Sequence, residues 1–492
     1  MKDTIKNGLE LLVIVVMTLV FGMKSYLSPF TNQVSGIDSS VFKTVSFMMR
    51  KGYMPYRDTF DHKGPLIYLI NYWGDMISPY RGVWVFEVLA LFFTFYFIYK
   101  IARLLCSEIP SFCVTISATT LLFSYYEDGG NFTEEYAMPF IAISLFYFLK
   151  YYIENDIRLG NIFICGLSVG GVLLLRPNMI TVWIVFCIAI VIDNVCNRNW
   201  KQLVRFTIWF TFGLCSILLP VCLWLLINGA LVDCWNDYIL FNILYTSDPE
   251  RTAIHNRIQS YLYFFITPLY FVSTILCVFS IIYRDRRINI IYLVYLLINP
   301  LLICLSGMCF AHYGMVLVPA MSYPLSLIFS EISDIGIKKT SKALSCIVGV
   351  WMTLTFAFSN WSGLIYSLPS IYHNRNVDCK EQTIIDMTQY IKNNTGKDDC
   401  ISVYGISNIF YVLSQRKHAT KYSYQFPIGQ IDTRIIFEYF EQLQEEQPPI
   451  VVVGGSYYDE NIKQFLDHND YQLIMSENEE DSGLLLFSKL KN

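Results

Sequence analysis

The densest group of polar side chains in the sequence lies between residues 55 and 65. Two cations in it, Arg57 and Lys63, are suited to bind a phosphate or diphosphate. Three groups that can orient these cations lie beside them: Asp58, Asp61 and His62. The proline that ends the segment is typical of the first turn of a helix. The segment predicts an anion site beside a helix. The alternative is a solvated turn whose Lys63 reaches toward lipid headgroups.

The carboxylate of Asp38 is a second candidate group. It precedes apolar residues at helical spacing over 41–49, which predicts an amphipathic helix at a membrane interface. An Asp side chain at the start of a helix commonly accepts free backbone N–H groups. A catalytic carboxylate held by such a cap would be rigidly placed. Spacing alone leaves the capping role and the catalytic role open.

A cluster of carboxylates occupies the segment 127–136, next to long apolar stretches. Thr133 followed by Glu134 and Glu135 has the pattern of a helix cap, which is the structural interpretation. Ionisable residues at the edge of a membrane also indicate a functional site. The sequence does not distinguish Glu134 from Glu135 as the reactive group.

Two further polar motifs interrupt apolar sequence. Arg176 lies two residues before Asn178 between apolar runs, and an Arg there is costly unless it pairs with an anion or a carboxylate. His312 and Tyr313 precede another apolar run, where a lone His is more often structural than catalytic. The charged and aromatic segment 228–259 is predicted to be a mobile loop on the substrate side.

The composition shows which elements must position these groups. Hydrophobic residues make up 54% of the 492 positions and charged residues 15%, against about 25% charged in soluble proteins. The chain is therefore predicted to lie in a lipid bilayer. The net charge of -4 indicates no particular partner, and no nucleic acid is expected. The scattered cysteines are predicted to fill apolar core positions.

Apolar stretches long enough to cross a bilayer predict about eleven spanning helices in an all-α polytopic domain over 1–360. They lie at roughly 9–27, 83–105, 109–126, 134–153, 159–176, 178–194, 206–227, 260–283, 288–306, 311–330 and 343–360. The loop 28–82 is predicted to be extracytoplasmic, with interfacial helices. Charges return in 361–492, which is predicted to be a small α/β domain outside the membrane. Its expected elements are a helix over 380–394, a strand over 400–404, a helix over 431–446, a strand over 449–454 and a helix from 459.

Lys and Arg in the short loops predict the orientation. They concentrate on every second loop, which places the N-terminus in the cytoplasm and 361–492 outside the cell membrane. The apolar segment 65–79 is only about 22 Å long as a helix, too short to span, so an interfacial or re-entrant position is expected. With this topology, the candidate groups fall on the outer side in four loops that can converge on one cavity.

A family resemblance follows from the motifs and their order. The motifs are Ile37-Asp38, the segment 56–65, the segment 131–136, Arg176-Pro177-Asn178 and His312-Tyr313. Over about residues 10–330 they resemble bacterial membrane glycosyltransferases of the GT-C superfamily. The closest group contains family 39 enzymes of the protein mannosyltransferase-like and aminoarabinose transferase-like kinds.

The resemblance implies an inverting sugar transfer from a polyprenyl-phosphate donor without a metal. Asp38 matches the essential acidic residue of the first outside loop, and Lys63 matches the lysine that contacts the carrier phosphate. This chain has Lys-Gly-Pro where the aminoarabinose transferases have Lys-Pro-Pro. An acidic residue at the outer end of the fourth span also recurs, matched by Glu134 or Glu135.

These positions suggest roles for each group. Asp38 would take the proton of the attacking acceptor hydroxyl. The donor phosphate would be bound by Arg57, Lys63, Arg176, His312 and Tyr313. The supporting residues would be Asp58, Asp61, His62 and Asn178. No metal-binding residues and no cofactor are predicted, and use of a divalent metal is left open.

The acceptor stays undetermined between a glycan, a lipid and a protein. Two other classes also stay open. One is a flippase or transporter of lipid-linked sugars, although no internal repeat is visible. The other is a non-catalytic membrane scaffold whose C-terminal domain binds a partner.

Overall fold

The computed structural model describes residues 2–31, 33–249, 252–335, 379–405, 408–477 and 483–490. The chain forms two compact units, each assembled from separate stretches of sequence. The helical unit contains Met1–Ser25, Val85–Cys222 and Thr246–Leu368. The α/β unit contains Tyr26–Trp84, Leu223–Tyr245 and Pro369–Asn492. The segment 28–82 thus belongs to the same unit as the C-terminal residues.

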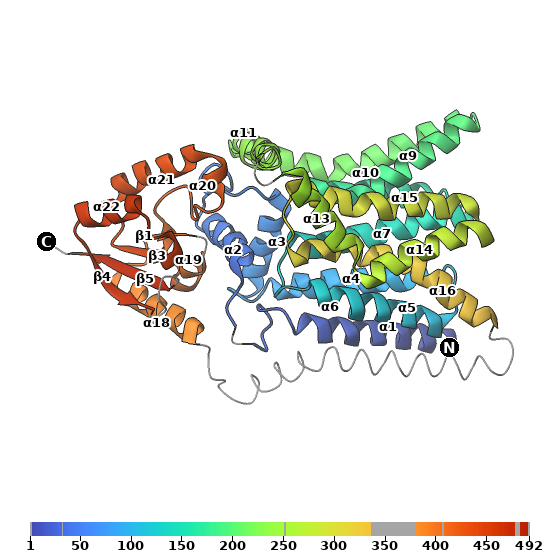
Figure 1. The fold of residues 1–492 in the computed structure, drawn as a ribbon, viewed down its shortest axis with the longest axis horizontal. Helices are drawn as coiled ribbons and strands as arrows, with labels where there is room; N and C mark the ends of the chain where they lie inside the picture. The colour runs from blue at the N-terminus through green and yellow to red at the C-terminus, as the bar shows by residue number, and fades with distance from the viewer. Residues whose placement is uncertain are drawn as a thin grey trace. The chain divides into compact units, whose positions relative to one another are not determined.

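The helices of the helical unit lie side by side as long rods (Figure 1). The α-helices are α1 Lys2–Gly22, α4 Trp84–Ala102, α5 Glu108–Ala118, α6 Ser124–Tyr126, α7 Thr133–Glu154, α8 Leu159–Leu173, α9 Thr181–Cys196, α10 Trp200–Ile227, α13 Ile254–Phe265, α14 Pro268–Tyr283, α15 Arg286–Ile303 and α16 Ser322–Ile335. Short turns complete them: η1 Thr119–Phe123, η2 Pro177–Met179, η4 Cys304–Ser306, η5 Ala311–Leu317 and η6 Pro319–Met321.

Six helical stretches of the described chain are long and apolar enough to cross a membrane, and a bent pair, Ile254–Phe265 with Leu269–Ile282, can add a seventh. The six are Trp84–Ala102, Glu108–Tyr126, Thr133–Glu154, Trp200–Ile227, Arg286–Ser306 and Ala311–Ser330. Three further predicted spans are shorter apolar helices, Gly8–Gly22, Leu159–Leu173 and Thr181–Cys196. The predicted span 343–360 lies outside the described residues. The chain is a membrane protein with several spanning helices, and the count of about eleven stays a prediction.

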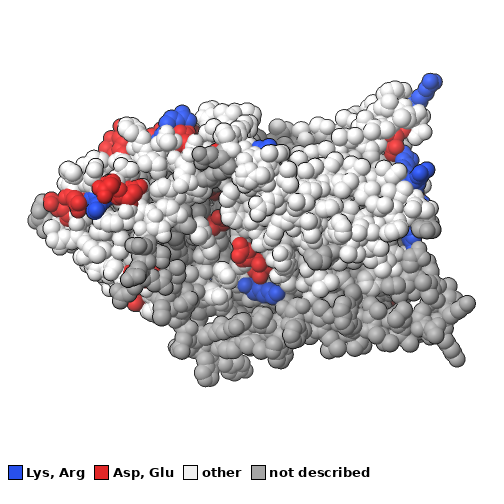
Figure 2. All heavy atoms as spheres, in the orientation of Figure 1, with Lys and Arg blue, Asp and Glu red and all other residues white. Residues whose placement is uncertain are grey.

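The surface of the helical unit fits a bilayer. Only 11% of the residues in the most apolar stretch of α10 are buried, and large side chains such as Phe212 and Leu219 face outward. Such an apolar exterior is stable in lipid and unfavourable in water. Figure 2 shows a broad uncharged face over these helices, with Lys and Arg gathered toward the end at which α9 ends and α10 begins.

Small residues bring α8 and α10 into direct backbone contact. A Cβ atom on Gly166 would lie 2.0 Å from the carbonyl oxygen of Phe210. A Cβ atom on Gly213 would lie 2.0 Å from the carbonyl oxygen of Phe163. Close helix packing through glycine is a common way for helices to associate in membranes.

The α/β unit contains a five-stranded sheet with the strand order β2-β1-β3-β5-β4. The strands are β1 Cys400–Tyr404, β2 Lys417–His418, β3 Ile450–Gly454, β4 Tyr471–Ser476 and β5 Leu484–Lys489. β1 is parallel to β2 and β3, with Ser402 opposite Val451, whereas β5 is antiparallel to β3 and β4. The apolar alternation of these strands forms the core with Met387 and Ile391 of the preceding helix.

The helices of this unit come from the same three stretches of sequence. They are α2 Ile37–Arg50, α3 Pro65–Ile77, α11 Leu231–Cys234, η3 Trp235–Leu240, α12 Phe241–Tyr245, α18 Cys379–Asn394, α19 Ile409–Ser414, α20 Ile428–Ile431, α21 Thr433–Glu446, η7 Gly455–Tyr457 and α22 Glu460–His468. The predicted small α/β domain is therefore confirmed. The predicted boundaries of the two domains stay a prediction, and the unit also includes the first outside loop and the segment 223–245.

Helix α2 forms where it was predicted, but it is buried. Residues from Ser39 to Met48 are buried, and the helix packs on α3 and α19. Lys43 in its middle is fully buried beside Asp75 of α3, with 3.4 Å between Nζ and Oδ1. The expected amphipathic surface is thus occupied by this unit's own helices, because the partners that cover it come from distant sequence.

Candidate functional site

The segment 53–63 folds into a tight loop before α3. The N–H of Tyr56 donates to the Thr59 carbonyl at 2.9 Å, with Tyr56 at a φ of 68°. Asp58 accepts the N–H of Met54 at 2.7 Å. Gly64 is the N-cap of α3 and Pro65 its first residue, as the sequence predicted. Local hydrogen bonds therefore fix the polar groups of this loop.

Arg57 is paired within the loop. Its guanidinium donates to both oxygens of Asp58 at 2.9 and 2.8 Å, and to the Asn228 carbonyl at 2.8 Å. Partial burial alone would raise the pKa of Asp58, but the hydrogen bonds from Arg57 and Met54 hold it below its usual range. Much of the charge of Arg57 is thus compensated by Asp58 before any ligand binds.

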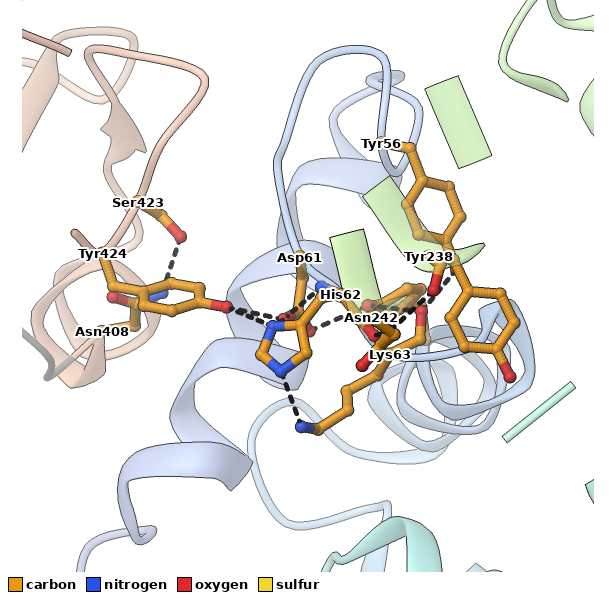
Figure 3. Close-up of polar contacts among 10 residues, drawn as sticks. Tyr56, Asp61, His62, Lys63, Tyr238, Asn242, Asn408, Ser423 and Tyr424 are labelled. Atoms are coloured by element: carbon orange, nitrogen blue, oxygen red, sulfur yellow. Dashed lines mark hydrogen bonds and ion pairs between the residues drawn. The ribbon is translucent and has the colours of Figure 1, made fainter. Parts of the chain in front are cut away.

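Lys63 is held by its neighbour His62 (Figure 3). Its Nζ lies 3.0 Å from His62 Nε2. No carboxylate lies within ion-pair distance of this ammonium among the residues that the structure describes. An ammonium group can only donate, so Nε2 accepts and the neutral ring carries its proton on Nδ1. The half-buried Lys63 charge is therefore oriented by His62, and the Asp61 carboxylate acts on it without forming an ion pair.

Asp61 is the buried centre of the polar cluster that it forms with His62, Lys63, Tyr68 and Tyr424. One carboxylate oxygen accepts from Tyr424 OH at 2.8 Å and the other from Tyr68 OH at 2.8 Å. The backbone N–H of His62 also donates to it at 2.8 Å. Burial raises the pKa of Asp61, while Lys63 and the two phenols act in the opposite direction. The carboxylate serves as a fixed acceptor for its surroundings.

Several residues of this cluster were missed by the sequence analysis. Tyr424 and Tyr68 bind Asp61, and Asn242 donates to the His62 carbonyl at 2.6 Å. The His62 ring stacks on Tyr245 with 5.8 Å between centroids. Tyr424 lies 361 positions after Lys63 in the chain, and no local motif marks it. Only the tertiary structure brings these side chains together.

Asp38 lies in the first turn of α2, as predicted. The N-cap residue is Gly36, and no side chain caps this helix. The half-buried carboxylate of Asp38 makes no hydrogen bond to any described residue. The capping role is thus not the one this structure contains.

The helical unit holds the second group of predicted residues. Arg176 forms an ion pair with Glu134, and Thr133 Oγ1 donates to the other oxygen of Glu134 at 2.8 Å. The Arg176 guanidinium stacks over the Tyr313 ring, 4.0 Å from its centroid. Buried charge at a membrane edge is stable only with such partners. The prediction that Arg176 needs an acidic partner is met by Glu134.

The other residues of this group have structural contacts. His312 stacks on Phe132 with 4.1 Å between centroids, and its Nδ1 lies 3.3 Å from Asp128 Oδ2. Glu135 accepts the backbone N–H of Asn131 at 2.9 Å. Asn178 donates to the Leu302 carbonyl at 3.3 Å. Glu134 and Glu135 thus differ in their partners, although both are buried.

The predicted residues thus form two groups. Asp38, Arg57 and Lys63 lie in the α/β unit, whereas Glu134 and Arg176 lie in the helical unit. Their convergence on one cavity stays a prediction. Among the described residues, no group of three or more His, Cys, Asp or Glu side chains is arranged to hold a metal ion.

A family model described as "Putative competence-induced protein Ccs4 N-terminal domain" matches residues 3–346. The chain belongs to this Ccs4 family. The match spans well over half of the sequence, and the description names no reaction. No curated protein matches the sequence of this Ccs4 family member.

Solved structures of similar fold exist for the Ccs4 family protein. ArnT from Cupriavidus metallidurans, bound to undecaprenyl phosphate, is similar over 99% of this chain and 98% of its own, with a TM-score of 0.65 and 10% identity. The apo state of that ArnT gives a TM-score of 0.62 and 11% identity, covering 100% of this chain and 99% of that one. The Archaeoglobus fulgidus oligosaccharyltransferase gives a TM-score of 0.57 and 10% identity, covering 96% of this chain and 72% of that one.

At these identities the similarity shows the fold. The Ccs4 family protein shares the architecture of ArnT and of the archaeal oligosaccharyltransferase along nearly its whole length. The GT-C-type fold expected from the sequence motifs is thereby confirmed. Membership of family 39 and a bacterial origin stay predictions.

Proposed function

We propose that this protein transfers a sugar from a polyprenyl-phosphate donor to an acceptor hydroxyl at the outer face of the cytoplasmic membrane. The observation that carries the proposal is the Lys63 ammonium, which His62 orients at 3.0 Å and which forms no ion pair with a described carboxylate. The shared fold supports it, since the similar ArnT structure is bound to undecaprenyl phosphate. A lipid-linked donor also accounts for a polar site built onto a membrane protein.

In this proposal Lys63 binds the donor phosphate and stabilises the negative charge that grows as the sugar departs. A cation without an ion-pair partner contributes more binding energy to a phosphate than a cation that is already paired. Arg57 is paired with Asp58, so Lys63 is favoured for this role. Arg57 would support the loop and reach the phosphate at its edge.

Asp38 is the proposed base. It would accept the proton of the acceptor hydroxyl as that oxygen attacks the anomeric carbon opposite the phosphate, which gives inversion. A base needs an available lone pair, and Asp38 makes no hydrogen bond to the described residues. Glu134 and Glu135 are less suited, because their oxygens already accept from Arg176 and from the backbone of Asn131.

Arg176 is a proposed second phosphate ligand. Glu134 and the Tyr313 ring would hold its guanidinium, and His312 and Asn178 would stabilise the surrounding loops.

The test is a transfer assay on full-length protein in lipid nanodiscs with a set of polyprenyl-phosphate sugars. We expect sugar release or transfer from one donor, and a loss of at least about 1,000-fold in Asp38→Asn, as for removal of a catalytic base. The matched control is Asp467→Asn, which changes a charge in α22 outside the site.

Three outcomes separate the candidate functions. Transfer that Asp38→Asn abolishes with an unchanged unfolding temperature supports the glycosyltransferase. Donor that crosses the bilayer without transfer indicates a flippase instead. If neither transfer nor translocation is detected with any donor, the protein is a scaffold and the proposal is contradicted.

A further inference from the structure

Tyr424, from the C-terminal part of the chain, brings a hydroxyl to the Lys63 loop. This hydroxyl donates to Asp61 Oδ1 at 2.8 Å and lies 3.2 Å from His62 Nδ1 (Figure 3). The Tyr424 and Asp61 side chains are both buried. Because buried polar groups depend on their partners for position, the hydroxyl fixes both the carboxylate and the ring.

The His62 ring passes this constraint to Lys63. Its Nδ1 edge faces Tyr424 and Asp61, and its Nε2 lies 3.0 Å from the Lys63 ammonium. The hydrogen on Nδ1 leaves Nε2 free to accept from Lys63. A ring that turned or changed tautomer would lose this contact.

The hydroxyl of Tyr424 remains a donor at any physiological pH. Burial raises its pKa well above the ordinary value, and the Asp61 carboxylate raises it further. The Asp38 carboxylate acts on Tyr424 in the same direction. The carboxylates of Asp38 and of Asp61, which lies beside Lys63, therefore both raise the pKa of this one hydroxyl.

A line of hydrogen bonds connects Tyr424 to the helix that carries Asp38. Its neighbour Ser423 accepts from Asn408 Nδ2 at 2.7 Å. The backbone N–H of Asn408 donates to Ser40 Oγ at 3.2 Å, and Thr44 Oγ1 donates to the Asn408 carbonyl at 3.3 Å. Ser40 and Thr44 lie on α2, two and six residues after Asp38.

We propose that Tyr424 is a positioning residue for Lys63, and that the C-terminal segment 408–424 sets the spacing between Asp38 and Lys63. The proposal rests on the function proposed above. It assigns the C-terminal part of the chain to the donor site itself.

The test compares Tyr424→Phe with Tyr439→Phe in the full-length protein in nanodiscs. Tyr439 is a matched control, since its buried hydroxyl bonds Ser402 in the same unit and touches neither Asp61 nor His62. Binding of undecaprenyl phosphate is measured by fluorescence titration. We expect Tyr424→Phe to weaken binding about threefold to tenfold, the effect of one lost hydrogen bond to a charged network, and Tyr439→Phe to leave it unchanged.

A double-mutant cycle distinguishes positioning from a general loss of structure. Lys63→Gln should weaken binding, and Tyr424→Phe should add little in that background, because its effect acts through Lys63. In the transfer assay, Tyr424→Phe should raise KM for the donor and also lower kcat, because Lys63 both binds the phosphate and stabilises the charge of the transition state; neither change should appear in the Lys63→Gln background. Should Tyr424→Phe fold poorly, Ser423→Ala carries the same comparison, since it removes the bond from Asn408.

The outcomes are separable from those of the proposed function. The inference alone is overturned if Tyr424→Phe binds undecaprenyl phosphate as tightly as wild type. It is also overturned if Tyr424→Phe weakens binding as much in the Lys63→Gln background as in wild type. Undecaprenyl phosphate that fails to bind wild-type protein, or binds Lys63→Gln as tightly as wild type, overturns the proposed donor site and the inference with it.

Discussion

The buried pair of Lys43 and Asp75 gives an asymmetric prediction. Lys43 is fully buried on α2, with 3.4 Å between its Nζ and Asp75 Oδ1 on α3. At an effective dielectric constant of about 20, this separation corresponds to about 5 kcal/mol of attraction. Asp75 also accepts from Ser46 Oγ at 2.7 Å and from the N–H of Tyr80 at 3.3 Å. Arg50 lies 3.9 Å from its second oxygen.

Removing either charge therefore has a different cost. Asp75→Asn leaves the Lys43 ammonium buried beside a neutral amide, and we expect a loss of about 3–5 kcal/mol. Lys43→Met leaves Asp75 with Ser46, Tyr80 and the partly exposed Arg50, so we expect a loss of only about 1–2 kcal/mol. The double variant should be more stable than Asp75→Asn alone, because it buries no unpaired charge.

The assay is thermal unfolding of the detergent-purified protein at one fixed scan rate, followed by tryptophan fluorescence. Ser46→Ala is a milder control, since it removes one hydrogen bond and no charge. Equal shifts for Asp75→Asn and Lys43→Met, or a double variant less stable than both, would refute the reasoning. Equal shifts would mean that Ser46, Tyr80 and Arg50 do not compensate Asp75 once Lys43 is removed. A double variant less stable than both would mean that an unpaired Lys43 charge is not the source of the Asp75→Asn loss.

Three further predictions follow from other contacts. Burial lowers the pKa of His418 to about 4, below its unfolded value of about 6.5. The unfolded state therefore binds the proton first as the pH falls, which lowers stability. Between pH 6.5 and 4, wild-type stability should fall by about 3 kcal/mol more than that of His418→Gln. Unfolding curves over that range measure the difference, and parallel pH profiles would contradict it. Gly166→Ala should lower the unfolding temperature by forcing α8 from α10, at a cost of about 1–3 kcal/mol, whereas Gly160→Ala, with nothing within 4 Å, should be neutral or stabilising. Arg176→Lys should reduce transfer at least about tenfold, because a lysine cannot pair with Glu134 and stack on Tyr313 in the same way; a transfer rate like that of wild type would exclude a role for its planar group.

The local elements could be predicted from the sequence. Long apolar stretches identify spanning helices because a bilayer requires about 20 apolar residues per helix. The short apolar-rich segments 400–404 and 450–454 identify buried strands, and Pro65 identifies the start of α3. The order of the motifs also led to the fold, through the resemblance that they carry.

The grouping of residues was decided by the tertiary structure alone. The amphipathic pattern of α2 shows that one face is apolar, but it does not show whether lipid or protein covers that face; α3 and α19 cover it. Likewise, Glu134 and Glu135 are adjacent and chemically alike, and only the fold gives one to Arg176 and the other to the backbone of Asn131.

The sequence by itself determined that this is a membrane protein, which residue types can bind a phosphate, and that the C-terminal part contains a small sheet domain. These properties depend on neighbours within a few residues. The tertiary structure decided that Asp61 and His62 are held by Tyr424, and that the segment 28–82 shares a unit with the C-terminal residues. Such contacts join positions more than 300 residues apart, and local periodicity contains no information about them, because burial and pairing depend on the whole fold.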